Sequence, residues 1–246
     1  MSAFAVFCAT DGSLTFYNRD TVPSVGSTFE GKVASNVYTG FDTAGYSSAT
    51  AIPWYPKAQE VISVSFTQEF ATVKPVKTAY WFYECQSLSS IDCIYLDTSN
   101  VNSMKSMFYN CSSITSLYLS GFDTSNVVDM ATMFGNCTSL ETIYVSESWS
   151  TSAVTKGANM FMNCSTSLVG AVPYDSTKTD ERMANYETGY FTYKRYVIPE
   201  DMLIKNTTLY NLADKIRILS NSKEDMIPSQ MVAILSNIHD AKGVQF

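Results

Sequence analysis

Six cysteines and one histidine are the side chains with the greatest chemical potential in this chain. Four of the cysteines recur at spacings of 26, 26 and 27 residues, namely Cys85, Cys111, Cys137 and Cys164. Thiols in a column can form disulfides, bind a metal or act as nucleophiles. Metal sites, however, use closely paired cysteines or added histidines, and neither occurs here. A ladder of small buried residues with weak S–H donors is the favoured interpretation.

The single histidine, His239, lies near the end of a predicted helix, where a solvated or C-terminal capping role is usual. The sequence contains no zinc-protease motif, no nucleophile elbow, no phosphate-binding loop and no dinucleotide fingerprint. We therefore predict no catalytic residue, no metal ligand and no cofactor, and we expect a protein that is not an enzyme.

Charge and hydropathy exclude two classes of partner. The net charge is -7 and only 16% of residues are charged, with no basic stripe that could follow a nucleic-acid backbone. No apolar run approaches the roughly 20 residues that cross a membrane. The first residues, MSAFAVFCATDGSLTF, lack the basic region of a signal peptide, so a standard secretory route is not expected.

The cysteines form one column of an internal repeat. Other columns keep the same step: Phe82, Phe108, Phe134 and Phe161; Met107, Met133 and Met160; Asn110, Asn136 and Asn163. A fixed period of this length predicts coils that bury their apolar faces only by stacking on one another. The asparagines each begin an N-C-S/T triplet, which is formally a glycosylation sequon. Their fixed register favours a structural turn ladder instead.

Two elements must position these columns in each coil. The pairs Ile91 and Cys93, Leu117 and Leu119, and Ile143 and Val145 alternate with polar residues or tyrosines, which predicts a short strand. Val101, Met104 and Phe108 recur at three- and four-residue steps, and so do Val127, Met130 and Phe134, which predicts a short helix. The expected fold class is an α/β repeat solenoid with one strand and one short helix per coil.

The segment DTSNV links strand and helix at residues 97–101 and 123–127. Asp97 and Asp123 suit an Asx turn that leads into a helix N-cap. Stacked carboxylates could also hold a cation, but Ser150 replaces the acid in the third copy. Capping is the favoured interpretation.

The candidate ligand-binding residues are those that point out of the predicted sheet, one pair per coil: Ser90, Asp92, Ser116, Tyr118, Thr142 and Tyr144. Tyrosines provide a large contact area at a small entropic cost, which favours a protein or glycan ligand. Tyrosine is also simply common on exposed strands, and that alternative stays open. The secondary candidates are Trp54, Tyr55, Trp81 and Trp149, although tryptophan is more often a core residue.

Three regions follow from these patterns. Residues 1–78 are expected to form a β-rich N-terminal cap that opens with a hairpin, with AVF and LTF as its arms. Residues 79–196 are expected to form the solenoid with its closing segment. Residues 197–246 show two apolar helical patterns separated by a polar loop, which predicts a C-terminal helical hairpin.

The DTSNV, M, MF, C and SL runs at a 26-residue step resemble the BspA-like leucine-rich repeats over roughly residues 79–193. The resemblance includes the closing run from the YDS stretch to GYFT. It implies a leucine-rich-repeat fold, a concave sheet face that binds a ligand, and a role in surface adhesion or recognition. It implies no catalytic residues.

Residues 198–240 resemble a small module at the ends of tail-associated proteins in phages and prophages, through TLYNLADKIR and PSQMVAILSNI. The loop SNSKEDMI lacks the glycine often found there. The resemblance implies a phage-tail virion protein that binds a host surface protein or glycan. It also implies that the hairpin contacts other virion proteins or a second copy. The alternative is a bacterial cell-surface or secreted adhesin. The ligand, the host and the oligomeric state stay open.

Overall fold

In the computed structural model, which describes residues 1–40 and 44–196, the chain begins with an antiparallel hairpin of β1 (Ser2–Cys8) and β2 (Ser13–Arg19). Both faces of this hairpin are buried. Phe7 and Phe16 point into the main core, while Phe4 and Tyr17 pack with Phe29 in a second, smaller core. The N-terminal hairpin predicted from AVF and LTF is therefore confirmed.

The rest of residues 1–78, here called the leader, extends this sheet. β3 (Thr28–Phe29) pairs with β4 (Lys32–Val33), and β5 (Asn36–Thr39) pairs with β1. Three short 3-10 helices follow at η1 (Ala49–Ala51), η2 (Tyr55–Glu60) and η3 (Gln68–Thr72), with β6 (Ser63–Phe66) before the last of them. β6 pairs in parallel with β2 on one side and with the first repeat strand on the other.

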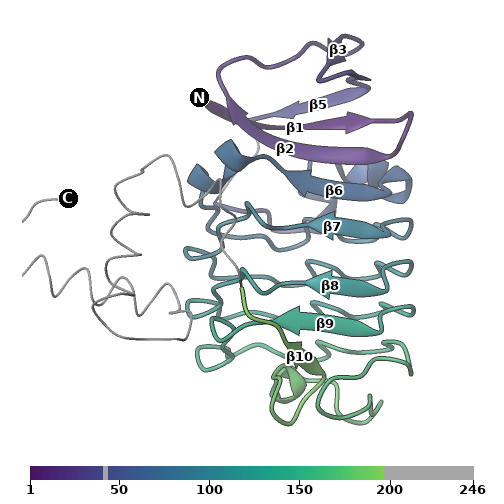
Figure 1. Ribbon diagram of the computed structural model, residues 1–246, viewed down its shortest axis with the longest axis vertical. Helices are drawn as coiled ribbons and strands as arrows, with labels where there is room; N and C mark the ends of the chain where they lie inside the picture. Colours follow the sequence, from purple (N-terminus) through teal and green to yellow (C-terminus); the bar gives the residue numbers. More distant parts are fainter. Residues whose placement is uncertain (41–43, 197–246) are drawn as a thin grey trace, which may run out of the picture. The chain divides into compact units, whose positions relative to one another are not determined.

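Short parallel strands mark successive coils. They are β7 (Ser90–Asp92), β8 (Ser116–Tyr118), β9 (Thr142–Val145) and, after η4 (Glu181–Met183), β10 (Phe191–Tyr193). One sheet has the order β5-β1-β2-β6-β7 and the next has the order β10-β9-β8. Figure 1 shows β7 to β10 lying one below another. The predicted strand column is confirmed, and the coils of a β-rich repeat stack as expected.

The predicted helix of each coil is wrong. Residues 104–111 form consecutive turns in which every second N–H bonds within the coil, as in Met107 N–H to the Met104 carbonyl at 3.1 Å. The alternate N–H groups point to the next coil, as in Phe108 N–H to the Met133 carbonyl at 2.9 Å. Ser106 and Asn110 have φ of 52° and 58°, which an α-helix cannot contain. The same arrangement recurs in the neighbouring coils, so a ladder of turns replaces the column of helices.

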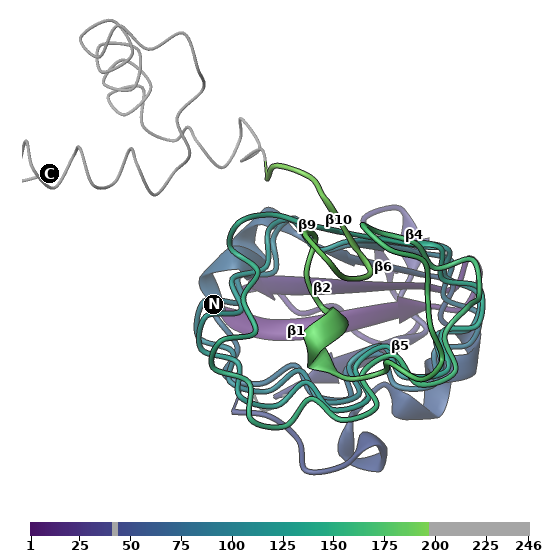
Figure 2. The same cartoon turned by 90° about the horizontal axis from the view of Figure 1, so that it is seen from below.

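Identical side chains stack inside the coils. The Phe82, Phe108, Phe134 and Phe161 rings follow one another at centroid distances of 5.7, 5.9 and 5.5 Å. Figure 2, which looks along the stack, shows successive coils tracing nearly the same outline. One continuous apolar core extends from Ala5 in β1 to Phe191 in β10. The division of the chain at residue 78 stays a prediction, since the sheet and the core both run across it.

Residues Met1–Tyr196 form one compact unit. The predicted C-terminal hairpin and His239 lie outside the described residues. Within the described part, no helix has the length and apolarity that crossing a membrane would require.

Candidate recognition face

The outer side of the parallel strands gathers the predicted binding residues. Between them, Leu117 and Ile143 point inward and are fully buried, so the alternation along each strand is the expected one. The outward residues, here called the outer face, are exposed or half-buried: Ser90, Asp92, Ser116, Tyr118, Thr142 and Tyr144. The structure thus brings all six to one side of the stack, while their role in binding stays a prediction.

Tyr118 and Tyr144 form the largest feature of the outer face. They are register partners on β8 and β9, and their rings stack at a centroid distance of 4.7 Å with an interplanar angle of 17°. Tyr118, on the edge strand of its sheet, keeps 49% of its surface exposed. Two parallel rings held by neighbouring strands give a rigid aromatic platform, because the strand backbones fix both Cα positions.

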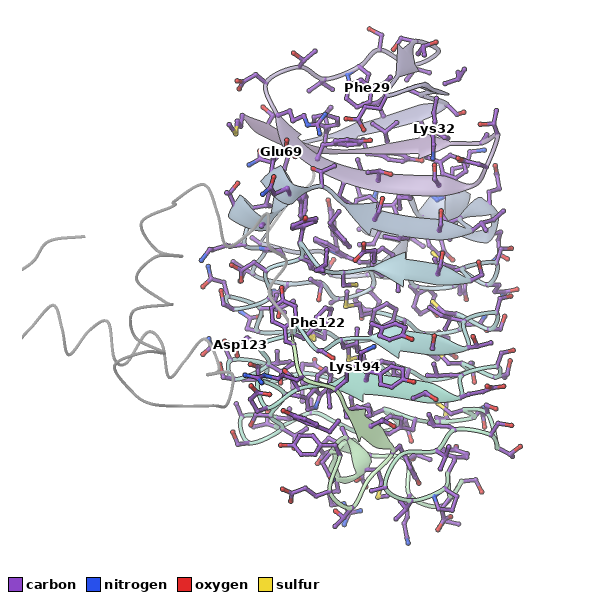
Figure 3. The ribbon with its side chains drawn as sticks, in the orientation of Figure 1. Phe29, Lys32, Glu69, Phe122, Asp123 and Lys194 are labelled. Atoms are coloured by element: carbon purple, nitrogen blue, oxygen red, sulfur yellow. The ribbon has the colours of Figure 1, made fainter. Side chains whose placement is uncertain are left out.

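Lys194, which no sequence pattern indicated, lies across this platform. Its ammonium nitrogen is 4.5 Å from the Tyr118 ring centroid and 5.1 Å from that of Tyr144. Its backbone N–H donates to the Val145 carbonyl at 2.7 Å, so the chain leaving β10 is fixed against β9. Figure 3 shows Lys194 in front of β8 and β9. Only the pairing of β10 with β9, across some fifty positions of sequence, reveals this contact.

The chain continues from Lys194 over the outer side of the preceding coils. Tyr196 donates from its hydroxyl to the Ile94 carbonyl at 3.4 Å. Its ring lies where a side chain on Gly121 would be, 2.9 Å from the position of an added Cβ. Burial raises the pKa of the Tyr196 phenol. Residues 194–196, here called the strap, are therefore seated on the repeat at both ends.

The outer face also continues into the leader, which no sequence pattern indicated. Ser63 pairs in register with Ser90, and Ser65 with Asp92. The Ser65 hydroxyl lies 3.1 Å from that of Thr15, on the next strand of the same sheet. Alternation in SVSF was the available signal, but the parallel pairing of β6 with β7 could not be read from it.

These stacked coils have a counterpart among known families. Residues 76–189 match a family model described as "Mycoplasma protein of unknown function, DUF285". Comparison with curated proteins and comparison with solved structures gave no match. All six predicted outer-face residues lie inside the DUF285 segment. Lys194 and the rest of the strap follow it, and Ser63 and Ser65 precede it.

The cysteines of the DUF285 segment are free and buried. The thiols of Cys111, Cys137 and Cys164 donate to the carbonyls of Phe82, Phe108 and Phe134, at 3.1, 3.1 and 3.2 Å. Burial raises the pKa of Cys85 and of Cys164 to about 12, and raises that of Cys111 and Cys137 well above the ordinary value. The ladder of weak donors is confirmed. Neutral buried thiols are poor nucleophiles and poor ligands.

Asp97 and Asp123 form the predicted Asx turns. Each carboxylate accepts the N–H two residues ahead, at 2.9 Å from Ser99 and 3.0 Å from Ser125. No helix follows, so the capping part of the prediction is wrong. Within residues 1–40 and 44–196, no three histidine, cysteine, aspartate or glutamate side chains are grouped to hold a metal ion.

The asparagine column serves the turns. Asn110, Asn136 and Asn163 have φ of 58°, 60° and 54°, a left-handed conformation that asparagine tolerates better than most residues. Asn136 also donates to the Tyr109 hydroxyl at 2.7 Å. The tryptophans behave as core residues, since Trp54, Trp81 and Trp149 are all buried. Tyr55 is half-buried and donates to Glu84 at 2.8 Å.

Proposed function

We propose that this protein is a non-catalytic recognition protein whose outer face contacts a protein or glycan on another surface. The stacked Tyr118 and Tyr144 rings support the proposal more than any other feature. A half-exposed aromatic pair on two hydrogen-bonded strands contributes contact area and loses little conformational entropy on binding. The polar residues beside the pair, such as Ser116 and Thr142, supply hydroxyl groups that can donate and accept hydrogen bonds to a ligand.

We propose further that the coils are a BspA-like variant of the leucine-rich repeat and that the protein serves as a tail-associated component of a phage or prophage particle. The resemblance of residues 198–240 to a module of tail-associated proteins supports this setting. In this scheme the C-terminal segment contacts other virion proteins or a second copy. The outer face meets the host surface.

A bacterial surface adhesin is the second candidate. The description of the family that residues 76–189 match names Mycoplasma proteins, which favours a cellular origin. Immunoblotting of purified particles and of washed prophage-free cells separates the two settings. Recovery with particles supports the virion component, and recovery on cells without any prophage rejects it.

Replacement of both platform tyrosines tests the recognition role itself. Tyr118→Ala with Tyr144→Ala is expected to abolish attachment of labelled protein to its target surface. The Tm should fall by only a few degrees, because the rings are outside the core and such a pair is worth about 0.5–1.5 kcal/mol. Val128→Ala, an exposed apolar residue on a different side of the coil, is the control. Unaltered attachment of the double variant would reject the assignment.

A further inference from the structure

The aromatic platform already has an occupant of defined chemistry. The Lys194 ammonium and the two ring centroids form a nearly equilateral triangle, with sides of 4.5, 5.1 and 4.7 Å. One cation therefore touches both rings at once. Such contacts arise because the negative ring face attracts a positive charge.

The strands around the platform contribute no other positive charge to the outer face, and Arg195, close enough to act on Tyr193, follows Lys194 on the strap. Among the described strands, the outward residues of β6 to β9 include no lysine or arginine, and Asp92 occupies the Tyr118 position of the preceding coil. On the other side, Glu147 accepts from the Tyr193 hydroxyl at 3.2 Å. The outer face near the platform is therefore negative, because it carries the tyrosine ring faces and two carboxylates. Its positive charge comes from the strap.

Within the described residues, Lys194 itself has no acidic partner. None of the ion pairs there includes it, and its nearest defined contacts are the two rings. The backbone hydrogen bond to Val145 holds only the main chain. Because the side chain is largely exposed, it can leave the rings without breaking β10.

From this geometry we infer that the Tyr118–Tyr144 platform is a site for a lysine ammonium. Lys194 fills it within the chain, and a lysine side chain of a protein partner takes its place when the protein attaches. The inference rests on the proposed recognition role and specifies its ligand chemistry. Complementarity of charge selects the partner: the face without the Lys194 ammonium attracts cations and repels anions.

The test uses the full chain and a blocked tetralysine peptide as the probe, with tetraglutamine as the neutral probe. Binding is followed by NMR of ¹³C-labelled tyrosine rings. Lys194→Gln is expected to bind tetralysine about two- to fivefold more tightly than the parent, the factor that an exposed cation–π contact gives. Lys156→Gln removes the same charge from an exposed site elsewhere and serves as the matched control. It should bind like the parent.

A second pair of variants removes the rings. In the Lys194→Gln background, Tyr118→Leu with Tyr144→Leu should eliminate the gain in tetralysine binding. In the parent background, the same change should abolish the upfield ring-current shift of the Lys194 ε-methylene protons. Equal affinities for Lys194→Gln and Lys156→Gln, or a gain that survives loss of the rings, would overturn the inference.

The inference and the proposed function fail in different ways. If the Tyr118→Ala and Tyr144→Ala variant loses attachment while Lys194→Gln shows no gain for tetralysine, the recognition face stands and a lysine ligand is rejected. If tetralysine binds as expected while attachment is unaffected by the tyrosine changes, the ammonium site stands and the recognition role is rejected.

Discussion

Single side chains join the coils through bonds that recur at each repeat. The hydroxyl of Thr124 is fully buried, donates to the Ser150 carbonyl at 2.8 Å and accepts from the Ser150 N–H at 2.7 Å. Thr98 makes the same two bonds with Asp123, at 3.0 and 2.9 Å. One buried hydroxyl thus satisfies a backbone donor and a backbone acceptor of the next coil. These two groups face the core, where water cannot replace the hydroxyl.

Removing that hydroxyl should be costly. Thr124→Val keeps the shape but leaves the Ser150 N–H and carbonyl without this partner, and we expect a loss of about 1–3 kcal/mol in the free energy of unfolding. Thr124→Ser retains the hydroxyl and should lose much less. Urea unfolding of both variants makes the comparison. A loss for Thr124→Val no larger than that for Thr124→Ser would contradict the stabilising role of these hydrogen bonds.

The buried thiols predict how stability depends on pH. Their pKa is raised in the folded state, whereas an unfolded thiol titrates near 8.5. The folded protein therefore keeps protons that the unfolded chain loses, and stability falls as pH rises above about 8.5. At pH 9.5 each such thiol costs about 1.4 kcal/mol relative to pH 7.

Paired alanine substitutions isolate this effect from other titrations. Between pH 7 and 9.5 the parent should lose about 3 kcal/mol more than the Cys111→Ala and Cys137→Ala double variant, by urea unfolding. Identical pH dependence in the two proteins would contradict the burial of these thiols.

At the scale of the element, the strand column was predictable from sequence, whereas turns were predicted only at the asparagines and a helix was wrongly predicted for the residues before them. Alternation around Leu117 and Ile143 has one structural meaning, because only a strand reverses its side chains at each residue. The spacing of Met104 and Phe108, in contrast, is compatible with two structures. A helix and a ladder of turns both direct these residues inward, and apolar spacing does not report which carbonyl receives each N–H.

The asparagine column held the missing information. A recurring asparagine at Asn110, Asn136 and Asn163 is typical of left-handed backbone, and three such positions in register argue against a helix. The six outer-face residues followed from the strand column. Lys194, Ser63 and Ser65 did not, because their places depend on which strands pair, and pairing between distant segments leaves no local pattern.

Excision of one complete repeat tests the element as a unit. Deleting residues 111–136 joins Asn110 to Cys137 with every column in register, so we expect a folded protein with a lower Tm, since one coil-to-coil interface is lost. Deleting residues 111–123 instead places turn residues in the strand column and should prevent folding. Circular dichroism and thermal melts distinguish the two. A folded short deletion would mean that the columns do not define the coil.

At the scale of the whole molecule, the leader and the repeats share one core. The Phe16 ring of β2 lies 5.6 Å from Trp81 and 6.3 Å from Phe82, so the first coil rests directly on the leader sheet. The compact unit that the leader and the repeats form ends at Tyr196. The molecule should therefore tolerate loss of its C-terminal residues better than loss of its N-terminal ones.

Truncation provides the corresponding test. Removing residues 198–246 should leave a folded solenoid, which circular dichroism would show as a retained β-rich spectrum with a cooperative thermal melt. If the C-terminal segment is the docking element, multi-angle light scattering should show loss of the assembled form. A truncated chain that keeps its oligomeric state would exclude that segment from assembly.

The alternating hydrogen bonds of the turn ladder also decide how the protein responds to force. Each coil is held to the next by parallel hydrogen bonds in the strand and turn columns, by the threonine and cysteine bonds and by the stacked core, so a pull along the stack loads these interfaces in series and they separate one after another. Each rupture would release one 26-residue coil, about 90 Å of extended chain. Under such a force the protein should lengthen in steps, with a terminal coil unfolding first while the remaining coils stay folded.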